Sequence, residues 1–458
     1  MSSTVVLRCL PAAVTVLVAG VGWVAAQGQP PAPEPPAGSE ITIQITGEAR
    51  SVVVLSYPVP DASAAGSLST AAREADATLR DDLEASRIFR LLGPQELAVL
   101  ALTGDPARDF ELHRSLGGQI LLDVAFTTEE GNLVLEGRLY DLKSGEPILG
   151  KRYRGEATAA RRIAHTFADE IVQYFAGRRG ISSTSLAFVS DRGGSRPNEI
   201  KEVFLMDYDG RNQRPVTAHK TISLSPSFSP SSDAVAYTSY FSGRPGLYLV
   251  LLPGGSKRAV ITDGSLNANP SFSPDGTRIA FTRSLGDGNS EIFVCNRDGS
   301  GLRQLTHANG IDTNAAWSPG GREIAFTSSR SGEPQLYTMD AEGANLRRIS
   351  LQGEYNDGAE WSPDGTRLTY ASRTGSNRFD ILLADLVTLE ATRLTSGPAS
   401  NESPTFSPDG QRIAFARTLG GGAGRTQIFA MDIDGGHPRQ LTSDGNNWAP
   451  SWSGFPPR

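Results

Sequence analysis

The chain has 458 residues, of which 38% are hydrophobic and 20% are charged. This composition is typical of a globular protein of more than one domain, and it argues against a disordered chain or a multi-span membrane protein. The 49 Gly and 29 Pro predict many turns and disfavour a mostly helical fold. The net charge of −7 disfavours a general nucleic-acid binder. Two Cys and five His leave little material for a metal cluster or a disulfide scaffold.

Residues 1–26 have the layout of a cleaved secretory signal. Arg8 precedes an apolar run over residues 11–24, and the small residues Ala25 and Ala26 follow it. The alternative is a short buried helix. We therefore expect a signal peptide that is removed after Ala26.

Residues 27–39 contain five prolines and no apolar periodicity. An extended tether is expected, and a polyproline ligand for a partner is the alternative. After cleavage Cys295 would be the single thiol, so the mature protein would have no internal disulfide.

The region 40–178 is predicted to be a small α/β domain. Runs of alternating or β-branched residues predict strands at 41–46, 51–57, 119–126, 132–142 and 148–155. Apolar residues at helical spacing predict helices at about 72–86, 105–116 and 163–175. Ser69 or Thr70 is the expected N-cap of the first helix. His165 lies in the third helix, where a structural role is favoured over a catalytic one.

From residue 181 onward the sequence repeats. Phrases of the type SFSPDG followed by IAFTS recur, and their marker prolines are spaced by 44, 45, 44 and 45 residues: Pro230, Pro274, Pro319, Pro363 and Pro408. This spacing is the length of one four-stranded propeller blade. In the turn of each phrase, proline sets φ at the second position and glycine accepts the positive φ. A third strand such as EIFVCN and a fourth strand ending in Thr or Ser complete six copies.

The two ends of the repeat region predict how the ring closes. SLAFVSDR (185–192) is a second strand without a first strand before it, and APSWSGF (449–455) is a first strand without a second strand after it. Joining them completes the sixth blade and removes the free sheet edges. The predicted fold is therefore an α/β N-terminal domain followed by an all-β six-bladed propeller over 181–458.

No residue pattern predicts catalysis. A hydrolase domain of the kind that accompanies some propellers needs a GxSxG motif with later Asp and His, and the sequence has no such motif. The acidic turns DYDG (207–210) and DIDGG (432–436) lack the spaced carboxylates and the late Glu of an EF-hand, so hairpin turns are expected there. An ion in the polar central channel is the alternative. We expect no catalytic residue, no metal ligand, no cofactor and no membrane span.

Five phrases are more specific than the generic repeat: DLEASRIFRLL (82–92), GRLYDLKSGEPILGKRY (137–153), RRIAHTFADEI (161–171), MDYDGRNQRPVT (206–217) and LSPSFSP (224–230). They resemble the TolB family, the periplasmic component of the Tol–Pal envelope system of Gram-negative bacteria. The resemblance covers residues 40–455. It implies a non-enzymatic periplasmic scaffold, a monomer within a multiprotein complex, that supports outer-membrane constriction at division.

The resemblance also implies two partners. The propeller would bind Pal, the peptidoglycan-associated lipoprotein, and the N-terminal region would bind the inner-membrane protein TolA. The strand that includes Ile41, Ile43 and Ile45 is the expected TolA contact, although the Pro-rich tether ahead of it departs from the family pattern. The alternative is a periplasmic propeller that binds cell-wall glycan or another envelope protein outside the Tol system.

In this family, the loops that lead from the fourth strand of one blade to the first strand of the next contribute contacts at the channel mouth. The matching positions here are Leu224, Asn267, Asn269, Thr313, Asn314, Asp357, Asn401, Glu402 and Trp448. For any one of them, stabilising a turn is the alternative role. Ala315 stands where the family usually has proline, so a different local backbone is expected at that loop.

Overall fold

The computed structural model describes residues 52–58, 66, 68–194, 199–286, 288–374, 378–420 and 424–457. The predicted signal peptide, the tether and the strand at 41–46 lie outside these ranges. Residues 51–458 form one compact unit. None of the helices in the described ranges has both the length and the hydropathy needed to cross a membrane.

The first part of this unit is a mixed five-stranded sheet in the order β2-β1-β3-β4-β5. Its strands are β1 (Val53–Ser56), β2 (Phe89–Leu92), β3 (Ile120–Glu129), β4 (Asn132–Asp141) and β5 (Pro147–Gly155). β1 pairs in parallel with both β2 and β3, whereas β3, β4 and β5 form an antiparallel meander. The strands predicted at 51–57 and from 119 to 155 are therefore present.

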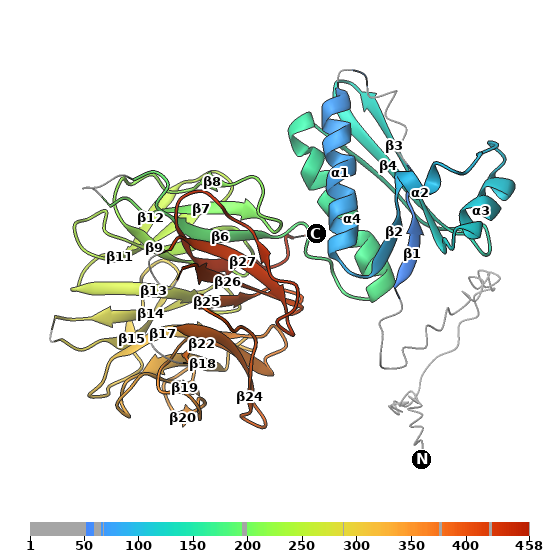
Figure 1. The fold of residues 1–458 in the computed structure, drawn as a ribbon. Helices are drawn as coiled ribbons and strands as arrows, with labels where there is room; N and C mark the ends of the chain where they lie inside the picture. The colour runs from blue at the N-terminus through green and yellow to red at the C-terminus, as the bar shows by residue number, and fades with distance from the viewer. Residues whose placement is uncertain are drawn as a thin grey trace, which may run out of the picture. The chain divides into compact units, whose positions relative to one another are not determined.

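Two long helices, α1 (Ser69–Ala85) and α4 (Ala160–Ala176), lie side by side against the sheet (Figure 1). Each helix buries one apolar stripe, as the helical spacing of its apolar residues predicts. Leu79 and Leu83 of α1 and Phe167 and Ile171 of α4 pack with residues of the sheet in one hydrophobic core. The predicted N-cap is wrong. Helix α1 already includes Ser69, its N-cap is Leu68, and no side chain caps it.

The shorter helices are α2 (Pro94–Leu97), the 3₁₀ turn η2 (Ala157–Ala159) and α3 (Pro106–Ser115). Helix α3 is capped by Asp105, whose side chain accepts a hydrogen bond from the backbone N–H of Ala107. Neither β2 nor α2 is predicted from the sequence.

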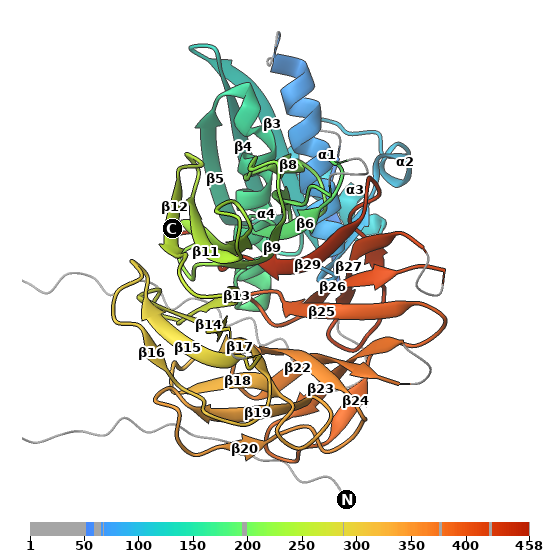
Figure 2. The same ribbon diagram turned by 90° about the vertical axis from the view of Figure 1, so that its left-hand side faces the viewer.

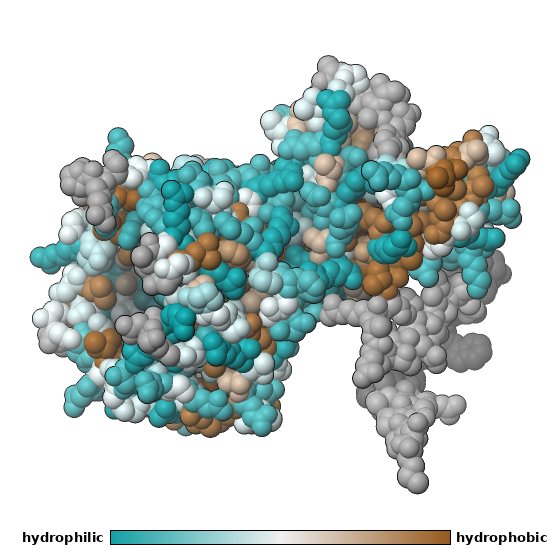
Figure 3. All heavy atoms as spheres, in the orientation of Figure 1, coloured by the Kyte–Doolittle hydropathy of each residue, from teal (hydrophilic) through white to brown (hydrophobic). Residues whose placement is uncertain are grey.

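Hydrophobic surface gathers over α2 and the segment that follows it (Figure 3). Val99 is 73% exposed and Leu102 is 54% exposed. This segment follows β2, and no further strand among the described residues pairs with the outer edge of β2. An apolar segment and an unpaired edge strand together favour association with another chain.

Six four-stranded antiparallel sheets follow within the described residues. Blade 1 contains β9 (Ser223–Phe228), β10 (Ala234–Ser239), β11 (Gly246–Leu251) and β12 (Lys257–Ile261), and blade 2 contains β13 (Leu266–Phe272), β14 (Arg278–Ser284), β15 (Glu291–Asn296) and β16 (Arg303–Gln304). Blade 3 contains β17 (Asp312–Trp317), β18 (Glu323–Ser328), β19 (Gln335–Asp340) and β20 (Arg347–Arg348). Blade 4 contains β21 (Asn356–Trp361), β22 (Arg367–Arg373), β23 (Phe379–Asp385) and β24 (Ala391–Arg393). Blade 5 contains β25 (Ser400–Phe406), β26 (Arg412–Thr418), β27 (Thr426–Asp432) and β28 (Arg439–Gln440).

The sixth sheet, which we call the closing blade, unites the two ends of the propeller. Its strands are β29 (Asn447–Trp452), β6 (Ser185–Ser190), β7 (Glu202–Asp207) and β8 (Arg214–Pro215). β29 pairs antiparallel with β6, and the indole N–H of Trp452 donates to the Thr184 hydroxyl at 2.8 Å. The predicted ring closure is confirmed, and Figure 2 shows the blades around a common axis.

A buried polar cluster joins α1 and α4 to the closing blade. Arg161 of α4 donates to Asp207 at 3.1 Å and to Asp209 at 2.8 Å. The two carboxylates of the DYDG turn therefore pair with an arginine of this protein. On α1, Asp82 lies 2.6 Å from the imidazole of His165 and accepts from the Tyr208 hydroxyl at 2.8 Å. His165 therefore lies in a structural network. The DYDG turn connects the antiparallel strands β7 and β8, as the predicted hairpin turn requires.

Ring closure predicts unequal effects for two tryptophans of β29. Trp452→Ala removes a buried indole from the apolar cluster shared by blade 5 and the closing blade, and we expect a loss of about 3–5 kcal/mol in the free energy of unfolding. Trp448→Ala, at a half-buried position of the same strand, should cost less than about 1 kcal/mol. Urea unfolding of both variants tests this, and equal losses would contradict the assigned role of Trp452.

The buried cluster predicts a pH dependence. Burial disfavours a charged His165, but hydrogen bonds and charge from Asp207 and Asp82 outweigh it and raise its pKa to about 9. The stabilisation is complete below the pKa of an unfolded histidine, near 6.5, and is lost as pH rises through 9. Between pH 6.5 and 9 the wild type should lose about 3 kcal/mol relative to His165→Gln.

Chemical denaturation across this pH range is the measurement. The control is His307→Gln, which changes an exposed histidine and should follow the wild-type curve. Parallel curves for the wild type and His165→Gln would show that folding does not raise the pKa of His165.

Candidate functional site

The innermost strands of the six blades surround a central channel of about 540 Å³. Its wall is built from the same segment of each blade, the first strand of the repeat: β9, β13, β17, β21, β25 and β29. Because all six strands run in the same direction along the channel, the residues that begin them share one mouth. The loops that precede these strands, and the loops between each second and third strand, belong to that same face, which we call the entry face.

Each innermost strand carries a bulge at the same place. The register to the second strand shifts there in every blade, and the residue at the bulge has a positive φ: Ser225, Asn269, Asn314, Gly358, Ser403 and Ala449. A bulge bends its strand and redirects its side chains. The φ values of Asn269 and Asn314 are both 52°, although Pro270 follows the first and Ala315 the second. The residue before Ala315 thus has the same φ as its counterpart before Pro270.

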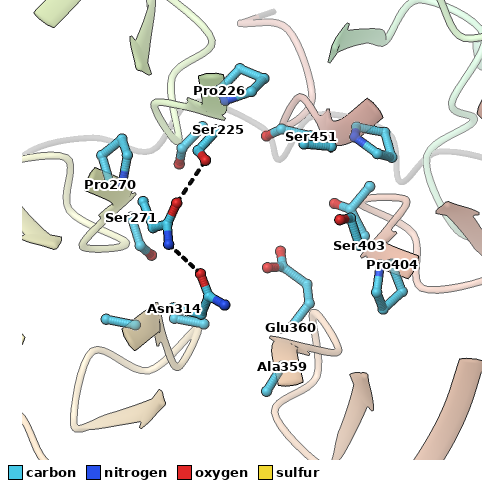
Figure 4. A pocket seen from close by; sticks show the side chains of 18 of the residues that line it. Ser225, Pro226, Pro270, Ser271, Asn314, Ala359, Glu360, Ser403, Pro404 and Ser451 are labelled. Atoms are coloured by element: carbon cyan, nitrogen blue, oxygen red, sulfur yellow. Dashed lines mark hydrogen bonds between the residues drawn. The ribbon is translucent and has the colours of Figure 1, made fainter. Parts of the chain in front are cut away.

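Polar side chains at the bulges form a chain of hydrogen bonds along the wall. The Ser225 hydroxyl donates to Asn269 at 2.6 Å, and the Asn269 amide donates to Asn314 at 2.5 Å (Figure 4). The Asn314 amide then donates to Asp357 at 2.6 Å. Asp357 ends the chain and also accepts from the Thr327 hydroxyl at 2.7 Å. Four blades are thereby connected around one side of the channel.

The structure brings four of the predicted contact residues to the channel wall: Asn269, Asn314, Asp357 and Glu402. Leu224 and Thr313 are half-buried and immediately precede the bulges of their strands. Trp448 holds the equivalent position in β29, and the ammonium of Lys201 lies 5.0 Å from the centre of its ring. These seven residues remain candidates for partner contact.

Asn267 and Asn401 cannot contact a partner in this conformation, because both are fully buried. Asn267 accepts a hydrogen bond from Arg283 at 3.1 Å, and Asn401 accepts from Arg417 at 2.8 Å. The same strand position is fully buried in the other blades, at Ser223, Asp312, Asn356 and Asn447. Its role is to hold the blade together. The recurrence of Asn or Asp at this position in five repeats is the sequence signal for that role.

Sequence reasoning missed Glu360, which extends from β21 into the channel (Figure 4). Burial raises its pKa to about 7, although water still reaches part of its side chain. Asp357 and Glu402 also line the channel, and none of the described lining residues is Lys, Arg or His. The channel wall is therefore acidic. Comparing AEWSP in blade 4 with PSFSP in blade 2 would have revealed the extra carboxylate.

Exposed apolar side chains occupy the loops of the entry face in five blades. They are Tyr240, Phe241, Leu285, Ile311, Leu351 and Leu419. Together they place apolar groups around an acidic opening. An apolar rim with a polar centre is suited to binding a protein rather than a small molecule.

The described residues contain no cluster of three or more His, Cys, Asp or Glu that could hold a metal ion. Cys295 is buried, and burial raises the pKa of its thiol to about 12. A thiol with a pKa this high is mostly protonated near neutral pH and is a poor nucleophile.

Residues 172–456, more than half of the chain, match the PD40 family, described as the TolB beta propeller domain. A protein TolB homolog from Chlorobium luteolum is 32% identical over 214 residues, which are 46% of this chain and 47% of that protein. The Tol-Pal system protein TolB from Geobacter metallireducens is 37% identical over 164 residues, 36% of this chain and 37% of that protein. The chain thus matches less than half the length of these curated relatives.

The fold is similar to the crystal structure of TolB from Acinetobacter baumannii. The TM-score is 0.73 at 25% sequence identity, and the match covers 88% of this chain and 97% of that chain. It extends beyond the propeller, so the likeness includes the α/β part as well as the ring. By its repeat region and by the fold of its described residues, this chain belongs to the TolB family.

Proposed function

We propose that this protein is a non-enzymatic periplasmic scaffold of a Tol–Pal system. It binds a Pal-type lipoprotein on the entry face of the propeller and a TolA-type inner-membrane protein through its N-terminal region. In this role it supports outer-membrane integrity and constriction during division. The similarity to the Tol-Pal system protein TolB of Geobacter metallireducens supports the assignment.

The observation that carries the proposal is the entry face itself. Exposed apolar loop residues surround a channel there, and the described lining of this channel contains three carboxylates and no Lys, Arg or His side chain. Apolar and aromatic groups supply the buried area of a protein interface, while charges at its centre select the partner and its orientation. The described lining of this channel holds no Lys, Arg, His or Cys side chain, which favours a scaffold over an enzyme.

Trp448 provides a test of the Pal contact. It is half-buried at the channel mouth beside Lys201, and Trp448→Ala should weaken binding of the Pal periplasmic domain at least fivefold, because aromatic anchors commonly cost more than about 1 kcal/mol when removed. Isothermal titration calorimetry measures the affinity. Val387→Ala is the matched control, since Val387 is exposed on the turn between β23 and β24 at the opposite face.

A pull-down from envelope extract separates this proposal from the alternative. Capture of a Pal-type lipoprotein supports it. Recovery of cell-wall glycan, or of another envelope protein without Pal, would place the propeller outside the Tol system.

The N-terminal segment provides a second test. If residues 41–46 bind TolA as an added strand, alternate side chains face the partner. Replacing Ile41, Ile43 and Ile45 together by Asp should abolish binding to the periplasmic part of TolA. Replacing Thr42, Gln44 and Thr46 by Ala should leave it nearly unchanged. TolA titration with and without Pal measures both effects, and equal affinity of the two variants would contradict a strand-like contact.

A further inference from the structure

The six innermost strands place one side chain each at the same level of the channel, two residues beyond the bulge. The equivalence follows from the pairing with each second strand, and the residues are Ser227, Ser271, Ala316, Glu360, Thr405 and Ser451. Five of them are small. Blade 4 alone of the six places an ionisable side chain at this level.

Three of the small residues at this level join neighbouring blades. The Ser271 hydroxyl accepts the backbone N–H of Trp317 at 3.3 Å, and the Ser451 hydroxyl accepts that of Phe228 at 3.2 Å. Thr405 does the same for Trp452 at 3.3 Å. Glu360 takes no part in such a bond, and its carboxylate extends into the open channel instead (Figure 4). Joining the blades therefore does not explain this glutamate.

The carboxylate of Glu360 has no hydrogen-bond or ion-pair partner among the described residues. The titratable groups that share the channel wall with it are Asp357 on β21, Glu402 on β25 and Tyr355 just before β21. Asp357 already accepts from Asn314 and Thr327, and Glu402 accepts from Ser400 at 2.9 Å. None of these groups is a cation. An enclosed carboxylate without a partner is costly in its charged form, and an incoming cation removes that cost.

We propose that Glu360 receives a basic side chain, lysine or arginine, of the protein that docks on the entry face. This inference rests on the proposed function and names the chemistry of the partner. The docked protein inserts this basic side chain past the bulges. The small side chains of the other five blades at the level of Glu360 leave the channel open for it. The neighbouring carboxylates Asp357 and Glu402 attract the cation, and Glu360 pairs with it at depth.

The donor set favours a side chain over a free metal ion. A calcium ion takes six to eight oxygen ligands, commonly including several carboxylates. Asp357, Glu360 and Glu402 line this channel, but the described residues include no group of three or more His, Cys, Asp or Glu side chains placed so that they could hold a metal ion. A single carboxylate is instead sufficient for one ammonium or guanidinium group, which forms a charge-assisted hydrogen bond.

The test measures affinity for the Pal periplasmic domain by isothermal titration calorimetry at pH 6 and pH 8. Glu360→Gln keeps the side-chain shape and removes the charge, and it should weaken binding about tenfold at pH 8. Wild-type affinity should fall between pH 8 and pH 6, because a protonated Glu360 cannot form the ion pair, whereas the variant should show a flatter profile. Glu390→Gln is the matched control, since Glu390 is exposed in the same blade on the opposite face.

The outcomes separate this inference from the proposed function. Wild-type binding that Glu360→Gln does not change overturns the inference and leaves the function in place, whereas no wild-type binding to Pal overturns both. Titrating calcium chloride into the free protein adds a further arm. A binding heat that disappears in Glu360→Gln would assign the carboxylate to a free ion instead of a side chain.

If Glu360→Gln does not fold, the wild type itself supplies the readout. Carbon NMR of the glutamate carboxyl groups gives the pKa of Glu360 with and without Pal. Pairing with a cation must lower this pKa on binding, and an unchanged or higher value overturns the inference.

Discussion

The blades of this ring bury their apolar faces against one another, and the rest of the structure depends on that packing. Leu249 of blade 1 shares an apolar cluster with Phe281 of blade 2, and Ile428 of blade 5 shares one with Trp452 of the closing blade. A single blade has two apolar faces and no core of its own. The ring must therefore be complete before any blade is fully stabilised, and the pairing of β29 with β6 completes it.

Closing the ring also creates the site. Six innermost strands that point along one axis leave a channel whose wall is polar, because neighbouring blades already use the apolar side chains of their faces. The polar groups satisfy one another where their repeats agree, as in the chain from Ser225 to Asp357. A wall residue with different chemistry appears where one repeat departs from the others. Glu360 is such a departure, since five equivalent positions are small.

Local turn chemistry explains why the fold could be predicted from the sequence. Each SPDG-type turn carries its own signal, and its spacing of 44 or 45 residues predicts both the blades and their closure. β2 (Phe89–Leu92) was missed because four residues are too few to show a period, and its pairing with β1 comes from tertiary contacts. Helix α1 begins at Ser69 without a side-chain cap, so the expected capping residue was wrong.

The site was harder to predict, because successive residues of a strand point to opposite sides. Asn267 and Asn269 are two residues apart on the same strand, but the strand bulges after Ala268. As a result, Asn267 is fully buried in the blade, whereas Asn269 lines the channel. The contact residues predicted from the sequence therefore include both Asn269, at the channel, and the fully buried Asn267 and Asn401. Aligning the repeats by their bulges would have separated the two classes.

The pairing of β29 with β6 also determines when this protein can fold. β6 begins at Ser185, whereas its partner strand β29 ends at Trp452, 262 positions after Ser190 along the chain. Translation from the N-terminus produces β6 long before its partner, so the closing blade cannot be completed during that interval. The last core to be completed is therefore the one between blade 5 and the closing blade, which includes Trp452 of β29.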